Sequence, residues 1–272
     1  MNKFPVCPIF IPANRLEWVE KTFDKGADAV IIDLEDSVPK EQKDEARTNL
    51  LSYLDSHDFD KTILIRVNPV DGGFGKDDMK VLSEASSKID AFMLPKIEEM
   101  GPLNELPDNL IALIETPKSI QNLEEIASHK NVIGIALGGA DLSASLGSDM
   151  SWDSLLFTRS KIILEAAANN LFTIDSPFMN IEDISSLENE SVLSSGLGFD
   201  GKAAIHPNQI ETIIKSFLPN EEDIQEAKEI IKLFNSSSEA VIAYKGKMID
   251  VPIVLSMEKR LRLVGIDSKN ID

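Results

Sequence analysis

The sequence reads LIALIET over Leu110–Thr116 and VIGIALGG over Val132–Gly139, and an amphipathic stretch, Pro117–Ser128, separates the two runs. Nearly continuous apolar character over such short lengths is typical of parallel strands that are covered on both faces. A strand, a helix and a second strand in this order form one right-handed crossover unit. This part of the chain therefore predicts an α/β fold.

The same alternation continues in both directions along the chain. Amphipathic stretches such as Arg15–Lys25, Pro39–Leu54 and Trp152–Asn169 separate the apolar runs. Eight repeats in roughly 215 residues favour a closed (β/α)8 TIM barrel, and the turn after the first run, PANR, lacks the glycine-rich fingerprint of a doubly wound sheet. The remaining predicted strands are Pro8–Ala13, Ala29–Glu35, Thr62–Asn68, Ala91–Lys96, Thr173–Pro177 and Gly201–His206.

The C-terminal part of the chain changes character. Glu221–Phe234 and Ile253–Leu263 have helical patterns, with a small polar turn and Tyr244–Pro252 between them. We predict a catalytic barrel over residues 1–220 and a C-terminal helical extension over residues 221–272. Extensions of this kind often contact a neighbouring subunit, and we expect the same here.

Composition limits the classes of function. Against 46 Asp and Glu stand 27 Lys and Arg, which gives a net charge of −19. This charge repels a phosphate backbone, so we expect no nucleic-acid partner. Cys7 is the single cysteine, which excludes an internal disulfide and fits a reducing compartment. No apolar run approaches the ~20 residues of a membrane span, and the N-terminus lacks a signal-peptide core. We therefore expect a cytoplasmic protein without a membrane partner.

Polar residues end nearly every predicted strand, where the active site of a barrel lies. Glu115 and Asp141 follow adjacent strands, so their carboxylates should lie close together. A cation between them relieves their repulsion, and oxygen ligands suit Mg²⁺. The alternative is that each carboxylate caps the helix that follows it. No histidine pair has zinc-ligand spacing.

Arg66 interrupts an otherwise apolar strand, and its planar guanidinium suits a carboxylate partner. We favour a substrate carboxylate over an internal ion pair, for which Asp33, Glu35 and Glu115 are the candidates.

Lys96 invites a Schiff-base interpretation, but an ion pair with Glu35 or Asp36 is preferred. His206 is either a general base or a structural hydrogen-bonding residue. The glycine-rich segment at residues 72–75 is either a mobile lid or a flexible turn.

Taken together, these residues resemble the HpcH/HpaI aldolase and citrate lyase β-subunit family. The matching stretches occur in family order over nearly the whole chain, and the ordered set is specific although each stretch is short. They are FIPAN at 10–14, DLEDSV at 33–38 with Lys43, Ala46 and Arg47, IRVN at 65–68, LPK at 94–96, IETP at 114–117, GGADL at 138–142, GFDGKAAIHP at 198–207 and MIDVP at 248–252. One departure is Val6-Cys7, where many members carry an Arg-Ser pair.

The resemblance implies roles for individual residues. Glu115 and Asp141 match the carboxylates that hold Mg²⁺, Arg66 matches the arginine that binds the oxo acid, and the backbone around Gly139 and Ala140 helps to hold the oxo-acid carboxylate. Asp250 matches an aspartate that reaches a neighbouring subunit's active site, which implies a homotrimer or hexamer. The candidate catalytic residues are Arg66, Asp250, Lys96 and Glu35; the candidate substrate-binding residues are Arg66, Gly139, Ala140, Asp33 and Asp36; the candidate metal ligands are Glu115 and Asp141.

The function that these residues predict is a Mg²⁺-dependent carbon–carbon lyase. It cleaves or forms a 3-hydroxy-acyl thioester, such as citryl-, malyl- or citramalyl-CoA, with a 2-oxo acid and an acyl-CoA or acyl-carrier-protein thioester as partners. Two alternatives remain open. One is a pyruvate-type aldolase that acts on free aldehydes without CoA, and the other is a non-catalytic subunit that binds an oxo acid.

Overall fold

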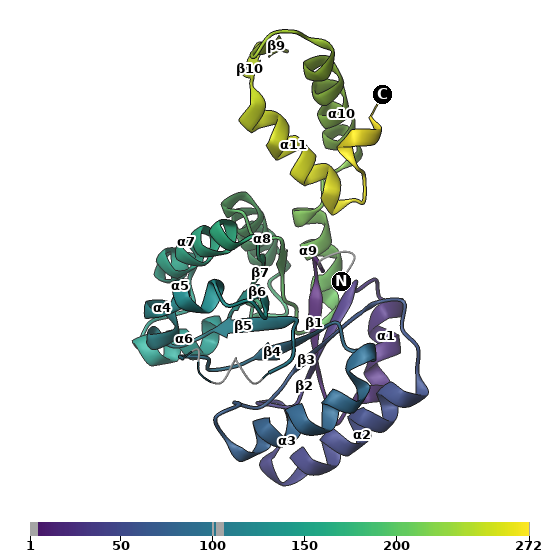
Figure 1. Ribbon diagram of the computed structural model, residues 1–272, viewed down its shortest axis with the longest axis vertical. Coiled ribbons are helices and arrows are strands. Elements are labelled where there is room, and N and C mark those ends of the chain that lie inside the picture. Colours follow the sequence, from purple (N-terminus) through teal and green to yellow (C-terminus); the bar gives the residue numbers. More distant parts are fainter. Residues whose placement is uncertain (1–4, 100, 102–105, 272) are drawn as a thin grey trace. The chain divides into compact units, whose positions relative to one another are not determined.

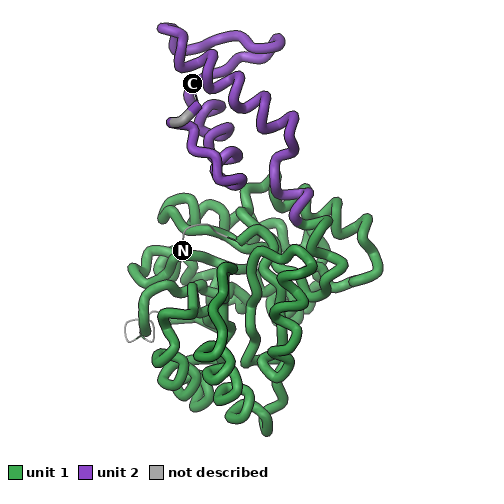
Figure 2. Tube along the Cα trace, turned by 90° about the vertical axis from the view of Figure 1, so that its right-hand side faces the viewer, with its two compact units in different colours: residues 1, 3–213 green, residues 2, 214–272 purple. Residues whose placement is uncertain are grey.

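The computed structural model describes residues 5–99, 101 and 106–271. The chain forms two compact units, which Figure 2 shows in separate colours: the first ends at Ile213 and the second begins at Ile214. The division lies inside helix α9 (Ile210–Phe217). In the described part of the chain, no helix is long and apolar enough to cross a bilayer.

The first unit is built on a parallel sheet whose strands lie in sequence order from β1 to β8 (Figure 1). A parallel bridge between Ile9 and Ala204 joins the last strand to the first, and Phe10 N donates to Ala204 O at 2.9 Å. The sheet is thus a closed barrel, which confirms the predicted fold and all eight predicted strand positions. The strands are β1 (Pro8–Pro12), β2 (Ala29–Asp33), β3 (Thr62–Arg66), β4 (Ala91–Leu94), β5 (Leu110–Ile114), β6 (Val132–Leu137), β7 (Phe172–Asp175) and β8 (Gly201–Lys202).

The barrel interior is filled by apolar side chains, as expected for a packed core rather than a pore. Each strand alternates between the interior and the surrounding helices, and both faces are buried, which explains the continuous apolar runs. The interior cluster contains Ile31, Leu64, Ala91, Met93, Ile111, Leu113, Ala136, Phe172, Ile174 and Ala203. Burying a side chain of the size of leucine stabilises the fold by roughly 1.5–3 kcal/mol.

Helices surround the barrel, and α7 occupies Trp152–Asn169 as the sequence predicts. The Ser151 hydroxyl accepts a hydrogen bond from Ser154 N at its start, and Asn170 ends it in the left-handed conformation. The other helices of this unit, besides α9 and short 3₁₀ turns, are α1 (Val19–Asp24), α2 (Lys43–Ser56), α3 (Gly73–Leu82), α4 (Pro117–Gln121), α5 (Leu123–Ala127), α6 (Gly139–Leu146) and α8 (Ile184–Leu197).

Two predictions about these helices were wrong. The predicted helix over Pro117–Ser128 is broken at Asn122, whose side-chain amide donates to Glu98 O at 2.6 Å. The segment at residues 72–75 is neither a lid nor a flexible turn, because α3 begins at Gly73. A Cβ atom on Gly75 would lie 2.2 Å from Pro69 O, so close packing of two backbones explains a glycine there.

The second unit contains helices α10 (Glu221–Ser236) and α11 (Val251–Leu263), with a hairpin between them that the sequence did not predict. The hairpin pairs β9 (Ile242–Tyr244) with β10 (Lys247–Ile249). Its two turn residues, Lys245 and Gly246, both have positive φ, as a tight two-residue hairpin requires. A core of its own joins these elements: Ala227, Ile230, Ile231, Ile249, Val254 and Leu261.

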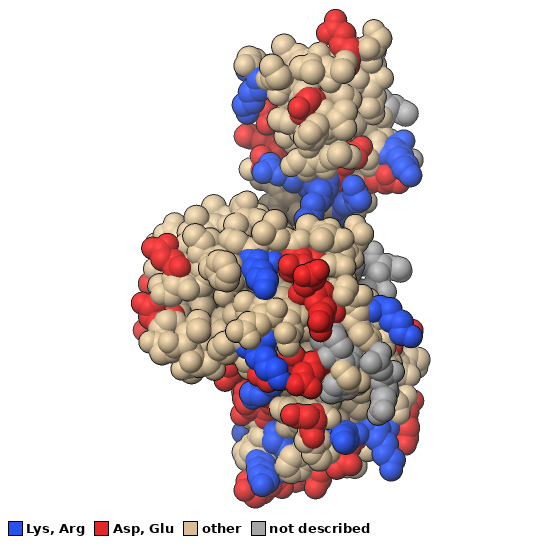
Figure 3. Space-filling view, turned by 60° about the vertical axis from the view of Figure 1, so that its left-hand side comes forward, with Lys and Arg blue, Asp and Glu red and all other residues tan. Residues whose placement is uncertain are grey.

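The surface of the first unit is less uniformly charged than a net charge of −19 suggests. Figure 3 shows broad uncharged areas between groups of acidic and basic side chains. On α7, Phe157 and Leu164 are 73% and 71% exposed. Some apolar side chains of α7 therefore lie on its exposed face rather than in the core.

Candidate active site

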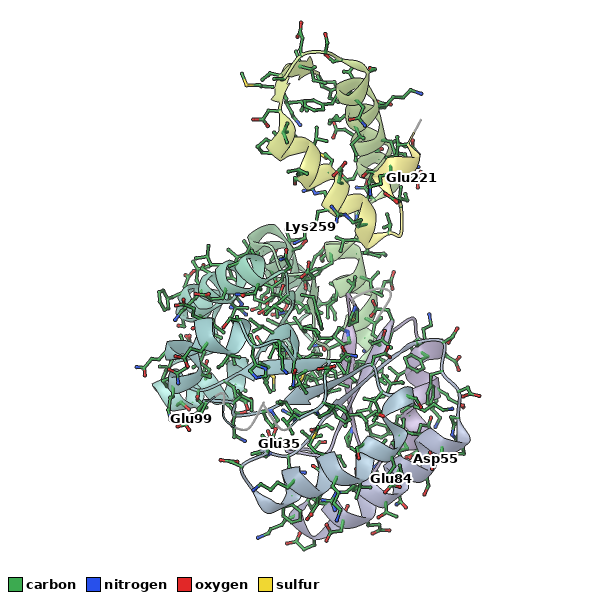
Figure 4. The ribbon with its side chains drawn as sticks, in the orientation of Figure 1. Glu35, Asp55, Glu84, Glu99, Glu221 and Lys259 are labelled. Carbon is green, nitrogen blue, oxygen red and sulfur yellow. The ribbon has the colours of Figure 1, made fainter. Side chains whose placement is uncertain are left out.

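A cavity of about 360 Å³ opens at the carboxyl ends of the barrel strands. Its volume falls within the range of small-molecule sites. The candidates Asp33, Asp36, Arg66, Glu115, Gly139, Ala140 and Asp141 all line it. Lys96 and Glu35 do not line it but contact residues that do: Lys96 N–H bonds Glu115, and Glu35 lies 3.3 Å from Arg66. Figure 4 places Glu35 within the barrel unit, whereas Asp55 and Glu84 lie on the outer helices.

Arg66 and Asp33 form a two-pronged ion pair at this end of the barrel. The register of β2 and β3 sets Asp33 opposite Arg66. Arg66 Nε donates to Oδ1 of Asp33 at 2.7 Å, and NH2 donates to Oδ2 at 2.8 Å. Both Asp33 oxygens also accept backbone N–H bonds, from Glu35 and Ser37. Burial alone would raise the pKa of Asp33, but the hydrogen bonds and charge of Arg66 outweigh burial and lower it.

This pair shows that the internal ion pair of Arg66 is present, and contact with a substrate carboxylate stays a prediction. Asp33, named as a candidate substrate contact, acts first as the group that orients the guanidinium. The third nitrogen, NH1, lies 3.3 Å from Glu35 Oε2 and 3.7 Å from Asp36 Oδ2. Arg66 therefore lines the cavity while its guanidinium stays bonded to Asp33.

Lys96 contacts the site through both its backbone and its side chain. Its Nζ donates to Oε1 of Glu35 at 2.7 Å, so the preferred ion pair is present. Its backbone N–H donates to Oε1 of Glu115 at 2.8 Å, and its φ of 53° orients the peptide for that bond. Burial raises the pKa of Glu35, and the charges of Arg66 and Lys96 offset only part of the rise. Burial would lower the pKa of Lys96, but the bond to Glu35 reverses this and raises it, which disfavours a neutral amine nucleophile.

Glu115 and Asp141 come together in the cavity, as the sequence predicts. Burial, then the negative charges of Glu35 and Asp141, raise the pKa of Glu115 to about 8. A glycine at 138 permits this approach, because a Cβ there would lie 2.6 Å from Glu115 Oε2. The capping alternative was wrong for both carboxylates: Thr116 caps α4, and Gly138 is the residue before α6, which places Asp141 inside the first turn.

These residues fit a hard divalent cation by the chemistry of their donors. Glu115 and Asp141 line one cavity, where burial and the charges of Glu35 and Asp141 raise the pKa of Glu115. Magnesium is usually held by one or two carboxylates with water or substrate oxygens in the other positions. Within the described residues, no group of three or more His, Cys, Asp or Glu side chains is arranged to hold a metal ion. The pair therefore matches an open magnesium site better than a closed structural one.

The first turn of α6 forms one wall of the cavity through Gly139, Ala140 and Asp141. Helix N-termini present free N–H groups that favour anions, and Gly138 has no side chain with which to cap them. Ser176 lies behind Gly139, because a Cβ on Gly139 would lie 2.9 Å from Ser176 Oγ. Gly139 and Ala140 therefore lie beside Asp141 in the cavity lining, and their binding of an oxo-acid carboxylate stays a prediction.

A buried ionic network supports this wall, and its central residue was not predicted. Arg159, from the middle of α7, lies 2.9 Å from Asp175 Oδ1. Lys202 Nζ donates to Asp175 Oδ2 at 3.0 Å, to Ser176 O at 2.7 Å and to Glu190 at 2.7 Å. Burial would raise the pKa of Asp175, but the two cations outweigh it and lower the pKa. The signal for Arg159 was present in the sequence: it shares the buried face of α7 with Leu155 and Ile162.

The remaining candidates are placed less centrally. His206 Nδ1 accepts a hydrogen bond from Asn208 N at 3.2 Å, a structural contact, and the general-base alternative stays a prediction. Asp250 belongs to the second unit, where its carboxylate caps α11 through Ile253 N at 3.3 Å. Lys43, which the sequence singled out without a role, donates to Leu34 O and Glu35 O at 2.8 and 2.7 Å. It therefore holds the loop that follows β2.

Comparison with known proteins gives one consistent result. The family described as HpcH/HpaI aldolase/citrate lyase matches residues 7–207. The citrate lyase subunit beta of Leuconostoc mesenteroides subsp. cremoris is 31% identical and aligns over 94% of this chain and 92% of its own. The mitochondrial citramalyl-CoA lyase of Homo sapiens is 28% identical over 94% of this chain and 84% of its own.

A solved structure supports the same relationship. The chain resembles CitE from Mycobacterium tuberculosis, in a complex with magnesium, acetoacetate and coenzyme A, with a TM-score of 0.82 and 29% identity. The match covers 98% of this chain and 100% of that one. The similarity therefore includes the C-terminal unit as well as the barrel.

Proposed function

Because the chain belongs to the HpcH/HpaI aldolase/citrate lyase family, we propose that it is a magnesium-dependent carbon–carbon lyase. It cleaves a 3-hydroxy-acyl thioester of the citryl, malyl or citramalyl type into an acyl thioester and a 2-oxo acid, or catalyses the reverse condensation. The thioester is carried by CoA or by an acyl-carrier protein.

The observation that carries the proposal is the Glu115–Asp141 pair at the ends of adjacent strands. Two carboxylates share a cavity in which burial and mutual repulsion raise the pKa of Glu115 to about 8. A lyase of this type needs a cation there to bind the oxygens of a 2-oxo acid. The first turn of α6 is placed to hold the oxo-acid carboxylate, and Arg66 offsets the remaining negative charge.

In cleavage, a base removes the proton from the 3-hydroxyl group of the acyl thioester. The C2–C3 bond then breaks as the hydroxyl carbon becomes the carbonyl of the 2-oxo acid. The electron pair of that bond passes to the thioester as an enolate, which takes up a proton to give the acyl thioester. When bound, magnesium supplies a Lewis acid that stabilises negative charge on oxygen. The Asp33–Arg66 pair and Lys96 fix the side chains around the reacting atoms.

Asp250 of a neighbouring subunit is the proposed base, in a homotrimer or hexamer. Large apolar side chains flank Asp250 in the second unit: Met248, Val251 and Leu255 are 71%, 52% and 54% exposed. Apolar side chains exposed on both sides of a carboxylate favour contact with another protein surface. Such contact would carry Asp250 to a partner's cavity.

The test uses Glu115→Gln and Asp141→Asn, with Glu124→Gln on exposed α5 as the matched control. With citramalyl-CoA and Mg²⁺, we expect the control to keep wild-type turnover and both site variants to lose at least about 1,000-fold. Calorimetry should show weakened Mg²⁺ binding by the same two variants. Turnover by wild type and variants alike in EDTA would sink the proposal, and cleavage of free aldehyde adducts alone would favour the aldolase alternative.

A further inference from the structure

The cavity walls narrow the identity of the oxo acid, an inference that rests on the proposed function. The named relatives include both a citrate lyase subunit and a citramalyl-CoA lyase. A citryl thioester releases an oxo acid with two carboxylates, whereas a citramalyl thioester releases one with a single carboxylate and a methyl group. The two substrates differ in one group on the hydroxyl carbon, which is carboxymethyl in the first and methyl in the second. The side chains around that group decide which substrate the cavity binds.

The floor of the cavity is apolar. Met93, Leu113, Ala136, Ile174 and Ala203 line it from five different parts of the barrel, and all belong to the interior cluster. Each of these residues is at most 4% exposed. The described lining contains further apolar side chains, which are Phe10, Leu137, Met150, Pro177, Met179 and Ile205. A methyl group meets favourable contacts on such a wall, and a carboxylate there loses its hydration.

The charged part of the lining carries an excess of carboxylates. Five line the cavity, namely Asp33, Asp36, Glu115, Asp141 and Asp175, and Arg66 is the one cation among the described lining residues. Two of the three Arg66 nitrogens bond Asp33, and the third faces Glu35 and Asp36. Other cations that contact the lining or Glu35 are paired as well: Lys96 with Glu35 at 2.7 Å, and Lys202 and Arg159 with Asp175 and Glu190.

We infer that the oxo acid is a monocarboxylate with a small apolar substituent, with pyruvate as the type, rather than a dicarboxylate such as oxaloacetate. One carboxylate has a place, at the cation that Glu115 and Asp141 would hold and at the first turn of α6. A second carboxylate finds no unpaired cation and faces either the apolar floor or the surplus of acidic groups. In cleavage, the citramalyl thioester yields pyruvate and an acetyl thioester, with the hydroxyl proton leaving to the base and a proton returning to the acetyl carbon.

Binding of three oxo acids separates charge from size. Pyruvate, oxaloacetate and 4-methyl-2-oxopentanoate are titrated into the whole protein in excess Mg²⁺. The last has a neutral branched group, slightly larger than a carboxylate, at the position of the second carboxylate of oxaloacetate. We expect oxaloacetate to bind about 100-fold more weakly than pyruvate, because a carboxylate without a partner is costly to bury. The neutral acid should stay within about tenfold of pyruvate.

Two variants test the role of the acidic surplus. Asp36→Asn removes one lining carboxylate and should improve oxaloacetate relative to pyruvate by about threefold, while Asp77→Asn, exposed on α3 outside the cavity, should leave that ratio unchanged. Equal binding of oxaloacetate and pyruvate overturns the inference, as does neutral-acid binding as weak as that of oxaloacetate. Magnesium-independent binding or no binding of all three acids instead contradicts the proposed function.

Discussion

Magnesium binding should depend steeply on pH, because Glu115 must lose a proton before it can act as a ligand. Its pKa in the metal-free protein is about 8, raised by burial, Glu35 and Asp141. Below that pH, a proton competes with the cation. The apparent dissociation constant for Mg²⁺ should therefore be about 100-fold larger at pH 6 than above pH 9, and about tenfold larger at pH 7.

The assay is calorimetric titration of Mg²⁺ at pH 6, 7, 8 and 9. Repeating the titration at pH 7 in buffers with different ionisation enthalpies counts the protons released, and we expect about 0.9 per magnesium ion. Glu35→Gln serves as the internal comparison, since it removes the largest like charge that acts on Glu115. That variant should lower the pKa of Glu115 and flatten the dependence between pH 7 and pH 9.

The reasoning is refuted by an apparent dissociation constant that stays the same between pH 6 and pH 9. Release of no protons at pH 7 would refute it equally. Either result would mean that Glu115 is already ionised in the metal-free protein, and that the cation relieves no repulsion.

Three further outcomes follow from the same contacts. The metal-free fold should lose stability as pH rises from the ordinary glutamate pKa of 4.5 to the raised pKa of Glu115, about 8, by up to about 5 kcal/mol in all. In EDTA, the Tm of Glu115→Gln relative to wild type should therefore rise steadily between pH 5 and pH 8 and stay level above pH 8. Arg66→Lys keeps the charge but not the two-pronged contact with Asp33, so kcat/KM should fall about 10–100-fold with citramalyl-CoA. An unchanged kcat/KM would count against a role for the Arg66–Asp33 ion pair. Asp250→Asn and Glu115→Gln chains, mixed in equal amounts, unfolded together and then reassembled, should regain about one quarter of wild-type turnover if each site combines two subunits in a ring. Turnover no higher than that of the separate variants would contradict a shared site.

The sequence predicted the barrel because its signal is local. Buried parallel strands read as apolar runs, and the amphipathic pattern predicted α7 at its observed bounds, where the Ser151 cap and the left-handed Asn170 end it. The predicted helix at 117–128 failed because the break at Asn122 depends on a contact with Glu98, distant in sequence. The hairpin at 242–249 was missed because the first of its two turn residues, Lys245, has a positive φ although lysine is not typical of that position.

The site was predictable in part for the same reason. The closeness of Glu115 and Asp141 follows from adjacent strands ending at one face of a barrel. The fork between Arg66 and Asp33 depends on the register of β2 and β3, which no local pattern contains. Arg159 shares a helical face with Leu155 and Ile162, but it was missed because a charged residue within a helix is usually solvated. Its ion pair with Asp175 of β7 shows that it is buried.

The central claim is that Glu115 and Asp141 hold a cation for cleavage of a 3-hydroxy-acyl thioester. The most direct test supplies citramalyl-CoA to the purified protein and measures pyruvate and acetyl-CoA together. We predict that both products form in equal amounts with Mg²⁺, and that EDTA or Glu115→Gln stops both. Formation of neither product with Mg²⁺ present, or of both at the same rate in EDTA, would contradict the claim.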